Sequence, residues 1–172
     1  LVLGAWRAPA QNPFPFPLGS AGQEYGKCAA RSPDGTIVVG ILFQNTVDFD
    51  GGPGTNRLGT PPGIDCAIVK YDPGGAVAWA RHLSGPASGA SSTVTITPHG
   101  IACDQDGNVY VAGYFGIAGS ATAAIVDFDP GPGVNTLTNT GGWDPFLLKL
   151  TSTGDFVWAR TLGAVIPAAT DE

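Results

Sequence analysis

Short apolar runs that alternate with glycine-rich turns recur along the chain and predict β-strands rather than helices. Residues 36–43 are β-branched and apolar, and residues 108–115 repeat this pattern after a second Asp-Gly turn. No stretch of the sequence carries the apolar period of an amphipathic helix. The expected strands, in chain order, are 27–31, 36–43, 66–71, 76–83, 101–104, 108–115, 146–150 and 155–162, and Val94 and Ile96 are candidates for a further short strand.

One acidic, glycine-rich segment occurs twice and shows that the chain contains an internal repeat. Residues 47–54 read Val-Asp-Phe-Asp-Gly-Gly-Pro-Gly, and residues 126–133 read Val-Asp-Phe-Asp-Pro-Gly-Pro-Gly. A register held over many positions indicates a repeat architecture. The downstream matches are Asn56 with Asn135, Leu58 with Leu137, Asp65 with Asp144, Lys70 with Lys149, and Trp79-Ala80-Arg81 with Trp158-Ala159-Arg160.

The repeat predicts both the organisation of the chain and its fold class. Four short strands per repeat, joined by tight glycine turns, are typical of a propeller blade, and propellers have about four to eight blades. The predicted fold is therefore all-β, with two tandem four-stranded propeller-type blades that form an incomplete propeller. Alternate prolines cannot donate to a central β-ladder, so the N-terminal segment is expected to be an arm or edge strand. The expected parts are that arm (1–25), repeat 1 (26–85), a connection (86–99), repeat 2 (100–164), and the start of a further repeat or a tail (165–172).

The chain resembles the bacterial β-propeller repeat family called SBBP, and the second repeat matches it well. Three segments carry the resemblance: Asp-Gly-Asn-Val-Tyr-Val-Ala-Gly at 106–113, the acidic segment at 126–133, and Gly-Trp-Asp-Pro-Phe-Leu-Leu-Lys at 142–149, followed by Gly-Asp-Phe-Val-Trp at 154–158. It extends over about residues 26–164. Proteins of this family are secreted or surface-attached and mostly non-enzymatic. The resemblance therefore implies a propeller-type fold and an extracellular or cell-surface location, and it bears less on activity.

Composition and charge narrow the classes of function. The 172 residues include 26 glycines and 15 prolines, but 43% are hydrophobic, which favours a folded chain with many turns over disorder. A net charge of −6 disfavours nucleic acid as a partner. No apolar run is long enough to insert into a membrane. Because the sequence lacks Met even at position 1, we expect a processed chain or a segment of a longer protein.

The three cysteines, Cys28, Cys66 and Cys103, fit no zinc motif. Their sequence positions are compatible with one disulfide and one free thiol. They are equally compatible with three reduced, buried thiols, since cysteine packs as a small hydrophobic residue.

Four aspartates of the duplicated segment are the candidate metal ligands: Asp48, Asp50, Asp127 and Asp129. Each pair is spaced i, i+2 and is followed by glycines, which let the backbone curl and present carbonyl oxygens. Ca²⁺ prefers several oxygen ligands of this kind, so the pattern suggests calcium as a cofactor. The alternative is that each carboxylate caps a turn through backbone N–H groups. No other cofactor is indicated.

The remaining polar and aromatic residues indicate packing rather than catalysis. The pair Trp79 and Trp158, each followed by an arginine two residues on, suits either stacking on a sugar or packing between blades, and equivalent positions in two blades favour packing. The histidines His82 and His99 stand in different sequence contexts, and no nucleophile-elbow motif is present. We therefore expect that the protein is not an enzyme.

Two blades leave strand edges and apolar flanks uncovered, which points to association. The predicted function is a non-catalytic extracellular structural module that self-associates through strand or blade edges into a filament or surface matrix. Its expected partners are other copies of itself or adjacent repeats of a longer chain. The alternative function is that of a glycan- or protein-binding β-propeller segment of a larger secreted protein.

Overall fold

The computed structural model describes Gly19 and residues 22–162, apart from residues 53, 60–63, 84, 86–93 and 121. All regular elements in this part of the chain are β-strands. The all-β prediction is therefore confirmed. The prolines at 13–17 and the segment 165–172 lie outside the described residues.

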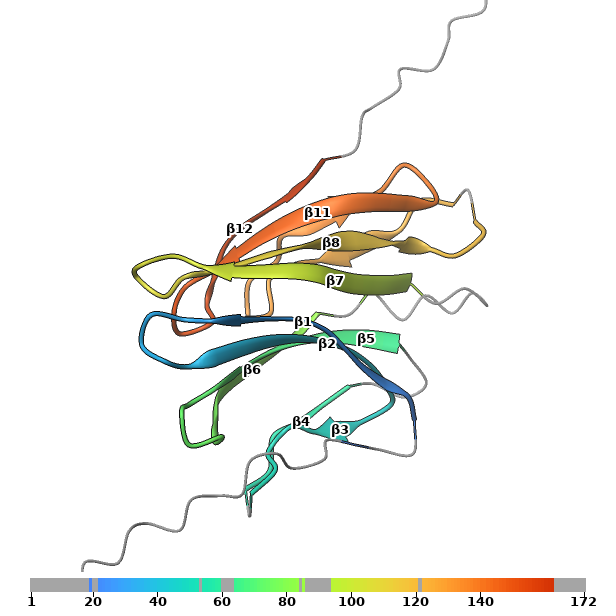
Figure 1. Cartoon of the computed structure of the whole chain (residues 1–172). Helices are drawn as coiled ribbons and strands as arrows, with labels where there is room; N and C mark the ends of the chain where they lie inside the picture. The colour runs from blue at the N-terminus through green and yellow to red at the C-terminus, as the bar shows by residue number, and fades with distance from the viewer. Residues whose placement is uncertain are drawn as a thin grey trace, which may run out of the picture.

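Eight of the strands form two four-stranded antiparallel sheets, one for each repeat (Figure 1). The first sheet has the order β1-β2-β5-β6, and the second has the order β7-β8-β11-β12. The two tandem blades expected from the sequence are thus present. The bounds are β1 (Glu24–Arg31), β2 (Ile37–Gln44), β5 (Ile64–Tyr71), β6 (Val77–Leu83), β7 (Val94–Cys103), β8 (Val109–Ile117), β11 (Trp143–Leu150) and β12 (Phe156–Thr161).

Tight turns place consecutive strands side by side, and each turn contains a glycine with positive φ. Gly35, Gly75, Gly107 and Gly154 have φ between 78° and 87°, a conformation that side chains disfavour. The one large difference from the expected strand bounds is β7, which begins at Val94, inside the range expected for the connection. The strand begins this early because residues 94–98 also pair with β8.

Each acidic segment belongs to a small two-stranded ribbon, an element that the sequence pattern alone did not reveal. The ribbons are β3 (Val47–Asp48) with β4 (Arg57–Leu58), and β9 (Ile125–Asp127) with β10 (Thr136–Thr138). Phe49 and Phe128, which hold the same position in the two copies of the segment, are fully buried against their own sheets. The ring of Phe49 lies 5.2 Å from that of Phe43, and the Phe128 ring lies 4.8 Å from that of Phe146. Each ribbon therefore covers one face of its blade.

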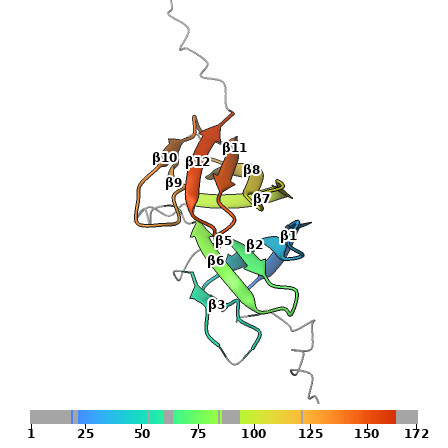
Figure 2. The same cartoon turned by 90° about the vertical axis from the view of Figure 1, so that its left-hand side faces the viewer.

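The two sheets stack on one another by their faces (Figure 2). Strand β7 of the second sheet lies against β1, β2 and β5 of the first. Val38 and Ile68 of the first sheet share one continuous core with Val111 and Leu148 of the second, and all four are fully buried. Gly40 makes this approach possible, since a Cβ at this position would lie 3.1 Å from the ring of Pro98.

Each sheet thus has two distinct faces. We call the side under the ribbon the ribbon face, and the opposite side the docking face. On the first sheet the docking face is buried beneath β7. The second sheet has the same strand pairing, since Ile37 opposite Tyr71 corresponds to Val109 opposite Leu150. Its own docking face, however, carries the exposed or half-buried side chains of Tyr110, Ala112, Tyr114, Trp143, Pro145, Leu147, Lys149, Trp158 and Arg160.

Candidate functional site

The junction between the sheets is closed by polar side chains of the first sheet that bind a tight turn of the second. We call Lys70, Trp79 and Arg81 the latch, and residues 151–155 the docked turn. Trp79 Nε1 donates to the carbonyl oxygen of Ser152 at 3.0 Å, and Lys70 Nζ donates to the same oxygen at 3.3 Å. Hydrogen bonds to backbone carbonyls satisfy acceptors of the turn that the contact between the sheets removes from water.

Arg81 completes the latch with a fork of donors. Its Nε donates to the carbonyl oxygen of Gly154 at 2.7 Å, and its Nη2 donates to that of Thr153 at 2.9 Å. A weaker ion pair joins the same guanidinium to Asp155 at 3.5 Å. The latch therefore recognises mainly the backbone of the turn. Any turn of the same backbone conformation offers the same acceptors.

Lys70 is the charged member of the latch, and it is held from two sides. Its side chain is only 5% exposed, and Nζ lies 3.2 Å from the carboxylate of Asp34. Hydrogen bonds from the hydroxyl and backbone N–H of Thr36, with a smaller contribution from Lys70, hold the pKa of Asp34 well below its usual range. The ion pair keeps a buried lysine compensated, because an unpaired buried charge is strongly unfavourable.

The second sheet carries the same donors at equivalent positions of its docking face. Lys149 is paired opposite Trp158, as Lys70 is opposite Trp79. Arg160 Nη1 donates to the carbonyl oxygen of the preceding residue at 2.8 Å, and Arg81 makes the same bond to its preceding residue at 3.2 Å. Lys149 lies 4.9 Å from the Tyr110 ring, and this tyrosine raises the lysine pKa. The donors of a second latch are thus present.

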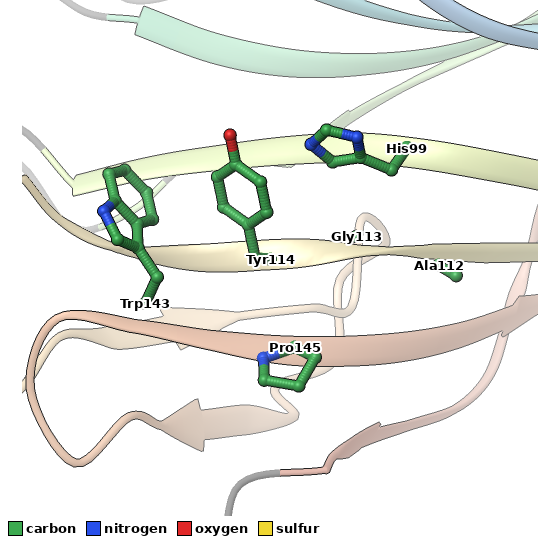
Figure 3. A pocket seen from close by; sticks show the side chains of 6 residues that line it. All are labelled: His99, Ala112, Gly113, Tyr114, Trp143 and Pro145. Atoms are coloured by element: carbon green, nitrogen blue, oxygen red, sulfur yellow. The ribbon is translucent and has the colours of Figure 1, made fainter.

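An aromatic row occupies the other half of the same docking face (Figure 3). The rings of His99 and Tyr114 are 4.7 Å apart, and those of Tyr114 and Trp143 are 4.9 Å apart. Together with Pro145 and Ala112 they line an open depression of about 470 Å³. Strand alternation places Tyr114 on this face, together with Tyr110 and Ala112 of β8, and pairing with β11 sets Pro145 opposite Tyr114.

The carboxylates of the acidic loops act as turn caps in both ribbons. Asp48 Oδ1 accepts hydrogen bonds from the N–H groups of Asn56 at 2.8 Å and Asp50 at 3.1 Å. Asp127 Oδ1 accepts the equivalent bonds, from Asn135 at 2.8 Å and Asp129 at 3.0 Å. The bond from Asn56 is also the main reason that the pKa of Asp48 is lowered. The second aspartate of each pair caps the next glycines, with Asp50 bonded to Gly52 and Asp129 to Gly131.

Calcium binding at these loops stays a prediction. Among the described residues, no three His, Cys, Asp or Glu side chains gather closely enough to hold a metal ion. Backbone carbonyls would have to complete the set of ligands. If calcium binds the folded loops, calcium at 100 times its dissociation constant adds about 2.7 kcal/mol to the free energy of unfolding. The test compares the melting temperature in calcium with that in a chelator. Equal values would exclude calcium as a structural cofactor.

The other polar residues singled out in the sequence are dispersed over the fold. Asp144 accepts a hydrogen bond from the N–H of Thr140 at 3.0 Å and so ties β11 to the preceding loop. Asp65, its counterpart, lies 3.0 Å from His82 on the neighbouring strand. His99 belongs to the other sheet. The two histidines are therefore not brought together.

The structure explains why sequence reasoning found only part of this site. The repeated Trp-x-Arg was visible, and packing between blades was the favoured interpretation, which Trp79 bears out with 9% exposure. The docked turn was missed as a partner, since nothing in residues 151–155 signals recognition of their carbonyl groups.

The cysteines are all free, and burial raises the pKa of the Cys66 thiol on the docking face.

The fold and the contact between its units define a β-propeller repeat module. Residues 79–114 match the family model described as β-propeller repeat, SBBP, which confirms the resemblance seen in the sequence. The match begins in β6 and ends in β8, so it crosses the junction between the two sheets. Strand β6 carries two of the three latch residues. The docked turn and Lys70 lie outside the matched residues.

Comparison with other proteins gives a consistent result. The chain is 32% identical over 136 residues to an uncharacterised WD repeat-containing protein of Acanthamoeba polyphaga mimivirus. That alignment covers 76% of this chain but only 9% of the relative. WD repeats are propeller blades of four strands. No solved structure matches the chain. Within the described residues, no helix has the length and hydrophobicity that crossing a membrane requires.

Proposed function

We propose that the chain is a non-catalytic structural module that associates with other copies of itself, or with adjacent repeats of a longer chain, to build a filament or surface matrix. One observation carries the proposal. The docking face that the first sheet buries against the second is present again on the second sheet, where it is exposed. A propeller-type blade is stable when neighbours cover its faces.

The expected association is head to tail. The docking face of one copy's second sheet would meet the ribbon side of another copy's first sheet, where Val39, Val77 and Ala80 are only partly buried. Such a heterologous contact produces a ring if the rotation closes and a filament if it does not. The two sheets of one chain share no hydrogen-bonded ladder among the described residues. The structure therefore favours stacking of faces over the addition of strands at an edge.

Several parts of the proposal rest on the family and on the residue pattern. The proposed extracellular or cell-surface location is supported by the SBBP resemblance. The latch donors bind the docked turn, and their counterparts on the second sheet hold equivalent positions. This use of polar residues for contacts between blades supports a non-catalytic role. Nucleic acid is not among the proposed partners, because the net charge is −6.

Sedimentation velocity over a range of concentrations, followed by electron microscopy, tests the proposal. We expect a reversible increase in mass as concentration rises, and ordered fibres or rings in the images. Units joined by a short linker experience an effective concentration of about 1 mM, and separate copies lack this advantage. The series should therefore extend to that range. A single monomer mass throughout would contradict self-association.

A second candidate function, binding of a glycan or protein, is supported by the aromatic row. The side chains of Tyr114 and Trp143 line an apolar depression of the size that small ligands occupy. Aromatic faces stack on sugars, and Arg160 on the same face can donate to hydroxyl groups. Dispersed particles together with a signal on a glycan array would favour this function. Assembly without such a signal would favour the first.

A further inference from the structure

The latch within the chain binds the carbonyl groups of a tight turn, and the four tight turns between neighbouring strands of the two sheets share its conformation. Among them, the turn between β5 and β6 holds the same place in the first sheet as the docked turn holds in the second. The docked turn is closed by the N–H of Thr151 bonding to the carbonyl of Asp155 at 2.8 Å, and by the N–H of Gly154 bonding back to Thr151 at 3.0 Å. The turn between β5 and β6 has the same two bonds, from Asp72 to Ala76 at 2.8 Å and from Gly75 to Asp72 at 3.0 Å.

The glycines of the two turns also share one conformation. Gly154 has a φ of 82°, and Gly75 has a φ of 87°. The carbonyl groups equivalent to those that the latch binds are therefore those of Pro73, Gly74 and Gly75. Pro73 and Gly74 are exposed, so their carbonyl groups lie on a part of the surface that another molecule can reach. The first sheet thus presents an unoccupied copy of the docked turn.

The second sheet presents the matching donors. Lys149, Trp158 and Arg160 hold the strand positions of Lys70, Trp79 and Arg81, and Arg160 is exposed. Within the described part of the chain, no hydrogen bond from the Trp158 side chain is found. Its counterpart Trp79 donates to the docked turn. The donors lie on the second sheet and the acceptors lie on the first. A contact between them would therefore join the second sheet of one copy to the first sheet of another.

Side-chain sizes are complementary at the closest point of the same contact. Inside the chain, Pro98 of β7 packs on Gly40. The pairing registers make Gly26 the counterpart of Pro98 and Ala112 the counterpart of Gly40. Between two copies, Ala112 on the docking face of one copy would therefore meet Gly26 on strand β1 of the other. A Cβ at Gly26 meets nothing within 4 Å, so this position is open.

We propose that Lys149, Trp158 and Arg160 of one copy bind the turn Asp72–Gly75 of a second copy through its backbone carbonyl groups. This inference rests on the proposed self-association and names the residues that carry it. The occupant is a second copy of this chain, because the turn and the open Gly26 are features of its own first sheet. In this arrangement the two cations would also approach the turn that carries Asp72, whose carboxylate has the opposite charge.

One contact of the internal junction has no counterpart between copies. The ion pair of Arg81 with Asp155 at 3.5 Å would be absent, because Ala76 replaces the aspartate. Ala76 is exposed, so an aspartate can be introduced there. Ala76→Asp should therefore strengthen the association, and only when Arg160 is present. A double-mutant cycle isolates this pair.

Sedimentation of purified chains gives the test. Arg160→Ala removes two donors to carbonyl groups and should weaken the association constant by about 10- to 100-fold. Arg160→Lys keeps the charge but loses the planar fork, so we expect an intermediate loss. Val134→Ala, at a loop residue that is 78% exposed, is the matched control and should associate like wild type. Ala76→Asp should associate several-fold more tightly, and Ala76→Asp combined with Arg160→Ala should show no gain. Thermal melting confirms that each variant is folded.

The outcomes separate the two proposals. If wild type associates and Arg160→Ala associates equally well, the latch between copies is refuted while self-association stands. If wild type remains monomeric up to about 1 mM, self-association and the latch between copies are both refuted, and adjacent repeats of a longer chain are left as the proposed partner. A gain from Ala76→Asp that persists without Arg160 would also overturn the proposed pairing.

Discussion

Trp79→Ala is expected to lower the free energy of unfolding by about 3–5 kcal/mol, as removal of a buried tryptophan does in other cores. Trp79 is 9% exposed, belongs to the core shared by both sheets, and donates to the docked turn at 3.0 Å. The substitution removes this packing and leaves the Ser152 carbonyl with one donor fewer. Total stabilities of about 5–15 kcal/mol are usual, so the loss would be a large share. Urea unfolding followed by circular dichroism measures it.

The repeat supplies a matched control at the equivalent position. Trp158→Ala changes the same residue type in the same Trp-Ala-Arg context, but Trp158 is only partly buried. Its cost should be about 1 kcal/mol, measured at a concentration at which sedimentation shows a monomer. Equal costs at the two positions would contradict the assignment of one docking face as covered and the other as open.

Phe128→Ala should likewise destabilise the protein by about 3–5 kcal/mol. Phe128 is fully buried, with its ring 5.3 Å from Phe115 and 4.8 Å from Phe146. Its loss leaves a cavity between the second ribbon and its sheet. The ribbon should also detach locally, and amide hydrogen exchange at Phe128, whose N–H donates to Asn135 at 3.0 Å, should accelerate. Urea unfolding and hydrogen exchange measure the two effects.

Two other substitutions frame this prediction. Ile125→Ala, on the same ribbon but 52% exposed, should change stability by about 0.5 kcal/mol or less. Phe49→Ala, in the first ribbon, should behave like Phe128→Ala, because Phe49 is equally buried and lies 5.2 Å from Phe43. A loss below about 1 kcal/mol at either phenylalanine would show that the ribbons are not part of the core.

Much of the local structure could be read from the sequence. Alternating apolar residues and Asp-Gly or Gly-Gly turns predicted eight strands close to the observed ones, because both signals act over a few residues. The strand β7 was predicted too short. Pro98 and Gly100 interrupt the alternation of apolar residues in this strand. They flank a β-bulge, and the strand continues across it because both sides pair with β8. The ribbons were missed because β3 and β4 are two residues each, and their stability comes from burial of Phe49 rather than from strand propensity.

The candidate site could be predicted only as a set of repeated residues. The acidic pairs were recognised, and the structure shows their carboxylates bonded to the backbone of their own loops. The aromatic row was not recognised, since His99, Tyr114 and Trp143 come from three separate strands. Alternation along β8 was the one available signal, and it places Tyr110 with Tyr114 without showing whether that side is covered.

The sequence by itself determined an all-β chain with two repeats, because strand period, turn glycines and repeat register are properties of neighbouring residues. The tertiary structure alone decided which faces of the blades are covered. Trp79-Ala80-Arg81 and Trp158-Ala159-Arg160 are identical in sequence, yet the first tryptophan is buried against a turn from the next sheet and the second is partly exposed. Burial depends on what lies across the face of a sheet, and no local pattern contains that information.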